Sequence, residues 1–314
     1  MPTRVVVFGY GPLALAALDA LARIGVTPAA VVVPGNRQGA DVDLVVTRAR
    51  KQSLPLLVQP KRSALGPFLE SLRALRPDVL LVWSYSMLLP PELIAVAPKG
   101  AFNLHGGILP AYRGGHVMNW AILNGERESG ATLHYIDAGI DTGDVVADER
   151  FPIEQSDDAA SVQGKLKAAG EALIAKWWPS IEQGTAPRTP QDESRARYYR
   201  MRTPDDGLVE WSQTNRQIYN LVRALSAPWP GAHTFAGDTK LVLRRVEAIQ
   251  SIDNTAVPGT VVRFEPGNVR VASGSGDLQI MTAEIDGREA GHAALQDAGL
   301  TQGARLGSPV NSIE

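Results

Sequence analysis

The chain contains 314 residues, of which 44% are apolar and 20% are charged, and its formal net charge is −2. This composition is that of a globular protein and excludes an intrinsically disordered chain, while the near-neutral charge predicts no general attraction to nucleic acid or to anionic membranes. The absence of cysteine excludes disulfides, thiolate zinc sites and cysteine nucleophiles.

The first half of the sequence alternates strand and helix patterns. Short β-branched runs are separated by stretches of helical periodicity, which predicts βαβ units and a parallel sheet with helices on both faces. The expected strands are 5–8, 29–33, 56–58, 78–83 and 100–104, and the expected helices are 13–24, 43–52, 65–75 and 91–97. The expected fold class is therefore α/β, with a Rossmann-like, mostly parallel sheet.

The pattern changes in the second half of the chain. Alternating strands at 131–136 and 143–151 are expected near the end of the sheet, and a long helix follows at 159–178. Short strands from residue 240 onward, separated by turn residues, predict a small β-barrel or sandwich, which we expect to be OB-like. The expected organisation is a catalytic domain at 1–186, a linker at 187–207 and a C-terminal OB-like β-domain at 208–314.

Two features of the N-terminal region bear on location and cofactor. No stretch approaches the ~18 consecutive apolar residues of a spanning helix, and a signal peptide's apolar region is missing, so we expect a cytoplasmic protein. Gly9-Tyr10-Gly11 fits a loose dinucleotide-binding pattern, but the second strand ends without the acid that contacts a ribose, which argues against an NAD-dependent oxidoreductase. We interpret this loop as a tight turn, with a phosphate site at the helix N-terminus as the alternative.

The most unusual segment follows the expected strand at 100–104. Asn103 and His105 alternate with apolar residues, so in a strand they share a face at its carboxyl end, where ligands bind in open α/β sheets. A glycine pair at 106–107 turns the chain, and Tyr112 and Arg113 add an aromatic ring and a cation suited to phosphate or carboxylate.

A second polar segment, Asp137-Ala-Gly-Ile-Asp-Thr-Gly-Asp144, places three carboxylates within eight residues between two expected strands. Its spacing does not match an EF-hand loop, which leaves a polar surface turn as the plain alternative. The five histidines show no ligand spacing either, so no metal site is predicted. His134, in an alternating strand, is expected to be structural.

Together these segments resemble the N10-formyltetrahydrofolate-dependent formyltransferase family. That family carries an Asn-x-His strand end, a Leu-Pro-x-x-Arg-Gly loop and an Asp-x-Gly-x-Asp-Thr-Gly loop, and all three occur here in that order. Residues 202–206 and 228–232 resemble the joint between its catalytic and C-terminal domains. The chain is most similar to the formyltransferase domain that modifies UDP-4-amino-4-deoxy-L-arabinose, and it is related to methionyl-tRNA formyltransferases.

The resemblance implies an N-formyltransferase with N10-formyltetrahydrofolate as co-substrate and no metal. Asn103 and His105 are expected to stabilise a tetrahedral oxyanion as hydrogen-bond donors, and Asp141 to orient His105 or to take the proton of the amine. The residues expected to contact the folate are Met87, Leu88, Leu89, Ile140 and Asp141.

The acceptor is predicted from charge. Residues 202–314 contain ten Lys and Arg against thirteen Asp and Glu, a net charge of −3, whereas a tRNA-binding domain is expected to be basic. We therefore expect a small acceptor, first a nucleotide-linked amino sugar such as UDP-4-amino-4-deoxy-L-arabinose. The alternatives are an N-hydroxyornithine-type amine for siderophore or peptide assembly, methionyl-tRNA, and a non-catalytic folate or nucleotide sensor. The residues expected to contact the acceptor are Tyr85, Tyr112, Arg113, His116, Arg200 and Arg202.

Overall fold

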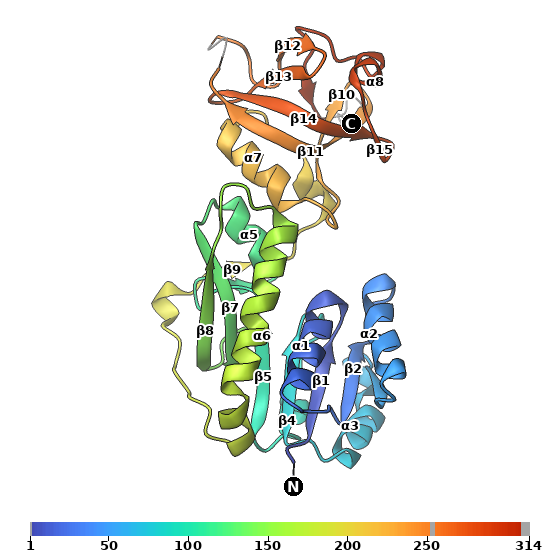
Figure 1. Cartoon of the computed structure of the whole chain (residues 1–314), viewed down its shortest axis with the longest axis vertical. Coiled ribbons are helices and arrows are strands. Elements are labelled where there is room, and N and C mark those ends of the chain that lie inside the picture. The colour runs from blue at the N-terminus through green and yellow to red at the C-terminus, as the bar shows by residue number, and fades with distance from the viewer. Residues whose placement is uncertain (1, 252–254, 309–314) are drawn as a thin grey trace. The chain divides into compact units, whose positions relative to one another are not determined.

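The computed structural model describes residues 2–251 and 255–308, which form two compact units (Figure 1). The N-terminal unit comprises the chain up to residue 117 together with 128–152 and 164–200. The C-terminal unit comprises 118–127, 153–163 and the chain from residue 201. Each unit is built around its own sheet, and each is described by itself.

A seven-stranded sheet forms the centre of the N-terminal unit, with strand order β3-β2-β1-β4-β5-β7-β8. Its strands are β1 (Val5–Gly9), β2 (Ala30–Pro34), β3 (Leu56–Gln59), β4 (Val79–Trp83), β5 (Gly100–His105), β7 (Glu128–Tyr135) and β8 (Val145–Pro152). The first five pair in parallel, and β7 and β8 add an antiparallel edge. The predicted mostly parallel α/β sheet is therefore confirmed.

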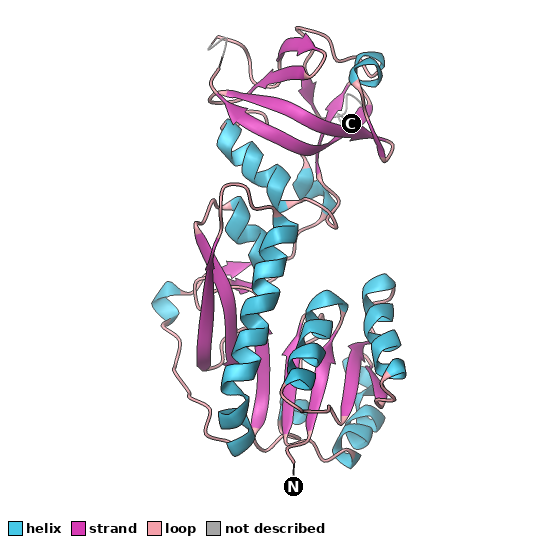
Figure 2. Ribbon diagram, viewed as in Figure 1, coloured by secondary structure: helices cyan, strands magenta, loops and turns pink. Residues whose placement is uncertain are grey.

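Helices cover both faces of this sheet, as the sequence predicts (Figure 2). They are α1 (Gly11–Arg23), α2 (Ala40–Lys51), α3 (Leu65–Ala74), α4 (Pro91–Ile94) and α6 (Ala159–Gln183), with 3-10 turns η1 (Arg62–Ala64) and η2 (Glu193–Arg195). Alternate residues of β1 and β4 pack against α3 and α4 in one core, whereas α1 and α6 contact the other face. Among the described residues, no helix is both long enough and apolar enough to cross a membrane.

The turn after β1 brings α1 very close to the sheet. A Cβ atom on Gly9 would lie 2.4 Å from the Trp83 carbonyl oxygen and 2.6 Å from Ala14 Cβ, and Gly11 has a φ of +70°. Only glycine fits the first position and is relaxed at the second. These contacts match the tight turn expected from the sequence.

The C-terminal unit is built on an antiparallel sheet with strand order β12-β13-β14-β11-β10-β16, and β15 pairs with β14. Its strands are β10 (Ala232–Ala236), β11 (Thr239–Ile249), β12 (Val261–Glu265), β13 (Asn268–Ala272), β14 (Asp277–Ile285), β15 (Arg288–Glu289) and β16 (Leu306–Gly307). Its helices are α5 (Val117–Leu123), α7 (Asn215–Ala224), α8 (His292–Asp297) and the 3-10 turn η3 (Pro204–Gly207).

This second sheet curls until its two ends meet. The Val261 amide donates to the Ala304 carbonyl and the Leu306 amide to the Gly259 carbonyl, each at 2.8 Å, which joins the chain around β12 to the chain around β16. The apolar face of α7 lies against the enclosed core. Pairing the edge strands removes exposed backbone donors and acceptors, and the curled sheet agrees with the predicted OB-like β-domain.

The contact between α6 and the sheet gives a test of this packing. A Cβ atom on Gly170, in the middle of α6, would lie 2.3 Å from the Trp83 ring, whereas one on Gly164 in the same helix would meet nothing within 4 Å. We expect Gly170→Ala to lower the free energy of unfolding by about 1–3 kcal/mol through overpacking. The matched Gly164→Ala should raise it by about 0.5–1 kcal/mol, because alanine favours a helix. Urea unfolding followed by tryptophan fluorescence measures both, and equal stabilisation by the two variants would contradict the tight contact.

Candidate active site

The carboxyl end of β5 carries the first two polar residues of the site. In the antiparallel pairing of β5 with β7, Asn103 lies opposite His134 and His105 opposite Thr132. Paired residues point to the same face of a sheet, so these four side chains share one face. Asn103 and His105 therefore lie side by side, as their alternation predicts, and β7 adds a second histidine to them.

The third expected residue, Asp141, lies in the loop between β7 and β8. It adopts a left-handed conformation with φ +55°, uncommon for a residue other than glycine. Asp137 fixes the loop by accepting a 3.0 Å hydrogen bond from the Gly139 amide. A Cβ atom on Gly143 would lie 1.9 Å from the last carbonyl oxygen of β7, so this position requires glycine. Ile140, at the tip, is 50% exposed.

The Asp141 carboxylate is the point where the polar side chains converge. Its Oδ1 atom lies 3.5 Å from Nδ1 of His105, 3.6 Å from Nε2 of His134 and 3.5 Å from Nδ2 of Asn103. Its Oδ2 atom accepts a 2.9 Å hydrogen bond from the Gly114 amide. The side chains of His105 and Asp141 are only 7% and 13% exposed. Asn103 and Asp141 are 38 positions apart in the sequence, and they thus meet with His105 in one largely buried cluster.

Backbone carbonyls fix which ring nitrogens of the two histidines carry a proton. Nε2 of His105 lies 2.5 Å from the Tyr112 carbonyl oxygen, and Nδ1 of His134 lies 2.8 Å from the Tyr135 carbonyl oxygen. Because a carbonyl only accepts, both nitrogens are N–H donors. Nε2 of neutral His134 is then an acceptor, and it receives the Asn103 amide at 3.0 Å. In neutral His105, the unprotonated nitrogen is Nδ1, which faces Asp141.

Burial and charge set different ionisation states for His105 and Asp141. Burial lowers the pKa of His105 below its usual 6.5, and this outweighs the opposite effect of the Asp141 charge. Burial also opposes ionisation of Asp141, but His105, His134 and the Gly114 amide more than offset it and lower the pKa of Asp141 to about 2. At neutral pH the cluster therefore holds an ionised carboxylate beside a neutral imidazole.

Arg113, expected to contact the acceptor, occupies a different place. Its side chain is 0% exposed, and its guanidinium donates to both carboxylate oxygens of Glu193, to Oε1 of Gln191 and to the Tyr198 hydroxyl. These hydrogen bonds raise its pKa further. A cation enclosed in this way presents no surface to a substrate, so we assign Arg113 to holding its own segment. Its charge and its place in the sequence suggest phosphate binding. The side chains that enclose it lie about 80 residues further along the chain, so the local sequence does not reveal them.

The loop after β4 carries the remaining residues expected around the folate. Gln59, at the end of β3, accepts a hydrogen bond from the Tyr85 hydroxyl at 2.9 Å and donates to the Leu88 carbonyl at 3.2 Å. The Leu88 side chain is 69% exposed, whereas Leu89 is buried in the core and Met87 is half-buried. Gln59 therefore ties this loop to the end of β3 through Tyr85 and Leu88, and the Leu88 side chain has the most exposed apolar surface of the group.

The other residues expected to contact the acceptor come from both units. The Tyr112 ring stacks on Tyr199 with centroids 4.8 Å apart and planes 5° apart. His116 follows Gly114-Gly115 with φ +52°. Arg200 is exposed at the end of the N-terminal unit, and Arg202 belongs to the C-terminal unit, where its guanidinium lies over an indole ring. A substrate role for His116, Arg200 or Arg202 remains a prediction.

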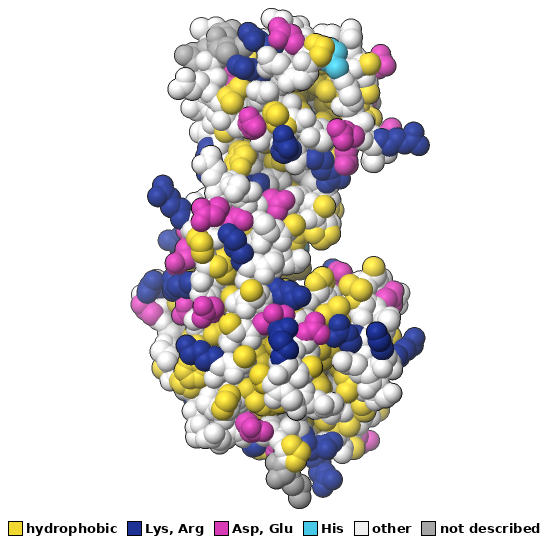
Figure 3. Space-filling model, viewed as in Figure 1, with side chains coloured by type: hydrophobic (Ala, Val, Ile, Leu, Met, Phe, Trp, Pro, Cys, Tyr) yellow, Lys and Arg dark blue, Asp and Glu magenta, His cyan; other side chains and the backbone are white. Residues whose placement is uncertain are grey.

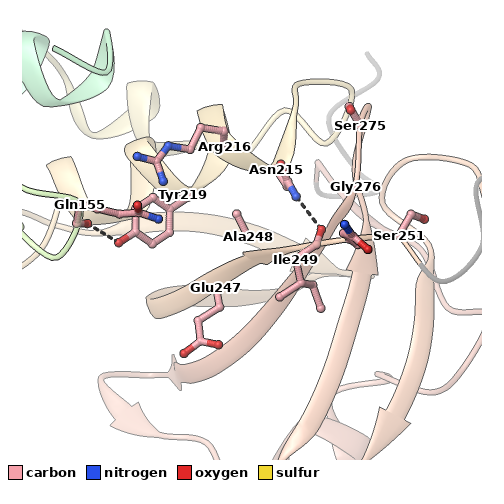
Figure 4. A pocket seen from close by; sticks show the side chains of 11 residues that line it. Gln155, Asn215, Arg216, Tyr219, Glu247, Ala248, Ile249, Ser251, Ser275 and Gly276 are labelled. Carbon is pink, nitrogen blue, oxygen red and sulfur yellow. Dashed lines mark hydrogen bonds between the residues drawn. The ribbon is translucent and has the colours of Figure 1, made fainter. Parts of the chain in front are cut away.

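A separate pocket of about 840 Å³ lies in the C-terminal unit, between α7, the end of β11 and the turn before β14 (Figure 4). The Tyr219 hydroxyl donates to the Gln155 carbonyl at its margin, and the Asn215 amide donates to the Ile249 carbonyl. None of the residues expected at the site lines it. In the part of the chain that the structure describes, no group of three or more His, Cys, Asp or Glu residues is placed to hold a metal ion.

Two residues that contact the cluster were not among those expected at the site. His134 was expected to be structural, because the sequence does not show that its strand pairs with β5 in the register that faces Asn103. Gln191 donates to the Asp141 and Gly143 carbonyls from a stretch that was expected to be a linker. Both contacts depend on tertiary pairing, for which the local pattern carries no signal.

Known structures share this architecture. WlaRD, described as a sugar 3N-formyl transferase in the presence of dTDP and 5-N-formyl-THF, is 19% identical with a TM-score of 0.66, over 92% of this chain and 99% of that one. The N-formyltransferase from Helicobacter canadensis, in complex with folinic acid and dTDP-3-aminofucose, is 19% identical with a TM-score of 0.65, over 90% and 100%. HypX from Aquifex aeolicus, in complex with tetrahydrofolic acid, is 17% identical with a TM-score of 0.64, and this chain spans 50% of its length. At such identities the likeness shows a common fold.

Family profiles match both units. The profile of the formyl transferase family matches residues 3–177, and that of the formyl transferase C-terminal domain matches residues 202–296. The first match alone covers more than half of the 314 residues. The chain therefore belongs to the formyl transferase family, and the prediction of an N10-formyltetrahydrofolate-dependent formyltransferase from its sequence motifs is confirmed.

Proposed function

We propose that this enzyme transfers the formyl group of N10-formyltetrahydrofolate to the primary amine of a nucleotide-linked amino sugar, with Asn103, His105 and Asp141 as catalytic residues. The observation that carries the proposal is the buried cluster in which a neutral His105 lies beside an ionised Asp141, at the carboxyl end of β5. A neutral base beside a fixed negative charge suits the removal of a proton from an attacking amine.

In the proposed reaction the amine nitrogen attacks the formyl carbon, and the carbonyl electron pair moves to its oxygen. The Asn103 amide has two N–H groups. One is given to His134 at 3.0 Å, and the other makes only a long 3.5 Å contact with Asp141, so we take this second N–H as the donor for the resulting oxyanion. Such a donor typically contributes about 10²–10³ in rate. The acceptor must therefore bind with its amine beside the exposed edge of Asn103.

The proton of the attacking nitrogen passes to Nδ1 of His105 and then to N10 of the folate as the carbon–N10 bond breaks. The products are the formamide and tetrahydrofolate, and the enzyme returns to its starting state. Asp141, with a pKa of about 2, is too weak a base to keep the proton at neutral pH. It stabilises the transient imidazolium instead, since its Oδ1 atom lies 3.5 Å from Nδ1.

The exposed side chains of Leu88 and Ile140 support a folate site on the loops that flank the cluster. Exposed large apolar side chains beside convergent polar groups are typical of small-molecule sites. We expect backbone groups of these loops to bond the edge of the pterin ring. The structures of WlaRD, the H. canadensis enzyme and HypX were each determined with a folate compound, which agrees with this donor.

An amino sugar is the acceptor class favoured by the solved relatives. WlaRD is described as a sugar formyl transferase, and the H. canadensis enzyme was solved with dTDP-3-aminofucose. UDP-4-amino-4-deoxy-L-arabinose is our first candidate among such compounds. On the face shown in Figure 3, Lys and Arg side chains of the C-terminal unit are interspersed with Asp and Glu, and the described residues there show no continuous basic patch. This pattern and the net charge of −3 from residue 202 onward disfavour tRNA.

Replacement of the carboxylate tests the mechanism. We expect Asp141→Asn to lower turnover by about 10²–10⁴-fold, the usual contribution of acid–base groups, while binding of the donor changes by only a few-fold. Steady-state kinetics and fluorescence titration with the folate measure the two effects. Asp148→Asn, an exposed acid on β8, is the control. Turnover unchanged by Asp141→Asn would remove Asp141 from the mechanism, and retained folate binding separates a catalytic loss from a folding defect.

The ionisation of His105 gives a second test. Because burial lowers its pKa, His105 should titrate below 6.5, and turnover should fall only as the pH drops through that lower value, where the base becomes protonated. In Asp141→Asn the pKa should fall further, because the carboxylate that raises it is gone. NMR titration of the histidine rings, assigned with His105→Gln, measures both values. A pKa at or above 6.5 in the unmodified enzyme would contradict the neutral resting state.

The acceptor is tested with a panel of amines and N10-formyltetrahydrofolate, by following the release of tetrahydrofolate. We expect turnover with UDP-4-amino-4-deoxy-L-arabinose or a dTDP-linked amino sugar, and none with N-hydroxyornithine or methionyl-tRNA. Binding of tRNA should be weak and should decrease steeply with salt. Tight tRNA binding at physiological salt would overturn the charge argument, and silence on every amine by the folded protein would favour the folate-sensor alternative.

A further inference from the structure

The stretch between α6 and the C-terminal unit is fastened to both loops of the active site. The backbones of Val145 and Thr189 form a reciprocal pair of hydrogen bonds of 2.8 and 3.0 Å next to the Asp141 loop. Further along, β9 (Tyr198–Tyr199) pairs in parallel with β6 (Arg113–Gly114). The stretch from 187 to 200 is thus bound to the N-terminal unit at both ends.

Gln191 lies between these two attachments and contacts both loops through one side chain. Its Nε2 atom donates to the Asp141 carbonyl at 2.9 Å and to the Gly143 carbonyl at 2.7 Å. Its Oε1 atom accepts from Nε and Nη2 of Arg113 at 3.1 and 2.9 Å. All four hydrogen-bonding positions of the amide are therefore used, two on the loop that carries Asp141 and two on Arg113.

Arg113 completes a closed ring of contacts around Asp141. The residue that follows it, Gly114, donates its amide to Oδ2 of Asp141 at 2.9 Å. Gln191 therefore holds the main chain of Asp141 directly, and it holds the segment that binds the carboxylate of Asp141 through Arg113. Glu193 adds a forked contact to Arg113 and does not touch the Asp141 loop among the described hydrogen bonds.

We infer that Gln191 is a positioning residue for the catalytic carboxylate: it fixes both the backbone and the side chain of Asp141 against His105. The inference rests on the proposed function in that it takes Asp141 as a catalytic group. Nothing in the sequence motifs indicates Gln191, since it lies 50 residues beyond Asp141 in a polar stretch.

The conformation of Asp141 explains why such a residue is needed. A left-handed φ of +55° is strained for aspartate and persists only where surrounding contacts enforce it. Without the Gln191 amide, the carbonyl groups of Asp141 and Gly143 would lose their donor, and the loop would be free to relax. A displacement of about 1 Å from a catalytic geometry costs on the order of 10²-fold in rate.

Two substitutions at this position separate the loop contact from the Arg113 contact. Gln191→Met keeps the length of the side chain and removes both N–H donors. Gln191→Glu keeps an acceptor for Arg113, with added charge attraction, but places an oxygen against the two loop carbonyls. If Gln191 acts on Asp141, both variants lose most of their activity. If it only supports Arg113, Gln191→Glu keeps an activity near that of the parent enzyme. Glu193→Gln, which alters the Arg113 contact alone, is the matched control.

We expect Gln191→Met and Gln191→Glu each to lower kcat by about 10²-fold. The KM for the folate donor should rise by a smaller factor, because only one of the two loops expected to bind the folate, the loop of Ile140, loses a contact. Glu193→Gln should keep kcat within about threefold, because Gln191 and Tyr198 still hold Arg113. Circular dichroism confirms folding, and two variants at one position keep the test valid if either fails to fold. A kcat near the parent value in Gln191→Glu, or an equal loss in Glu193→Gln, would overturn the inference.

A second readout does not depend on turnover. In Gln191→Met the Asp141 carboxylate is less firmly held near His105, so the pKa of His105 measured by NMR should decrease toward its value in Asp141→Asn. An unchanged titration of His105 would overturn the inference by itself. If the parent enzyme formylated no amine, the proposed function would fail, but this titration would still decide whether Gln191 positions Asp141.

Discussion

The site depends on keeping one carboxylate ionised inside the protein. Burying a charge is costly unless it is paired and hydrogen-bonded, and the Gly114 amide and the Asn103 side chain offset part of that cost by donating to Asp141. Burial opposes ionisation of Asp141, but His105, His134 and the Gly114 amide together lower its pKa to about 2. The carboxylate receives hydrogen bonds from β5 and from the segment of Gly114, and Gln191 holds its backbone, so it is in place only when the sheet edge, the loop after β5 and the stretch around Gln191 are assembled.

Two elements of the fold determine where these partners lie. The parallel strands bring Asn103 and His105 to the carboxyl end of β5, where open α/β sheets bind ligands. The antiparallel β7 then returns along β5 and ends in the loop that carries Asp141, which places His134 directly opposite Asn103. Because Asn103 and His134 point to the same face of the sheet, their side chains are hydrogen-bonded although they are 31 positions apart in the sequence. The glycines of the Asp141 loop allow the tight return that this arrangement requires.

The sequence predicted those parts of the fold and site that have local signatures. Strand and helix periodicity was sufficient for the parallel sheet, and the alternation at Asn103 and His105 for their common face. The partners of Arg113 were not predictable, because a buried and an exposed arginine look alike until Glu193 and Gln191 are placed beside it. His134 was interpreted as structural for the same reason: strand pairing over long range has no local code. The polar composition near 191 suggested a linker, although its side chains bond inward.

The resting state of the cluster is suited to the proposed reaction because it stabilises charge that appears only during turnover. In the free enzyme His105 is neutral, and its Nδ1 lone pair faces the Asp141 carboxylate at 3.5 Å. In this state the ring offers no positive charge to attract the carboxylate. In the proposed mechanism the amine proton moves to Nδ1 of His105, and the same 3.5 Å then separates two opposite charges in a buried site, where their attraction is much stronger than in water. The contact is therefore worth more after proton transfer than before it, which is the condition for lowering a barrier rather than merely binding substrate. If the Asp141 carboxylate were displaced from this position, the protein would still fold and the carboxylate would be solvated. It would then no longer stabilise protonated His105 more than neutral His105.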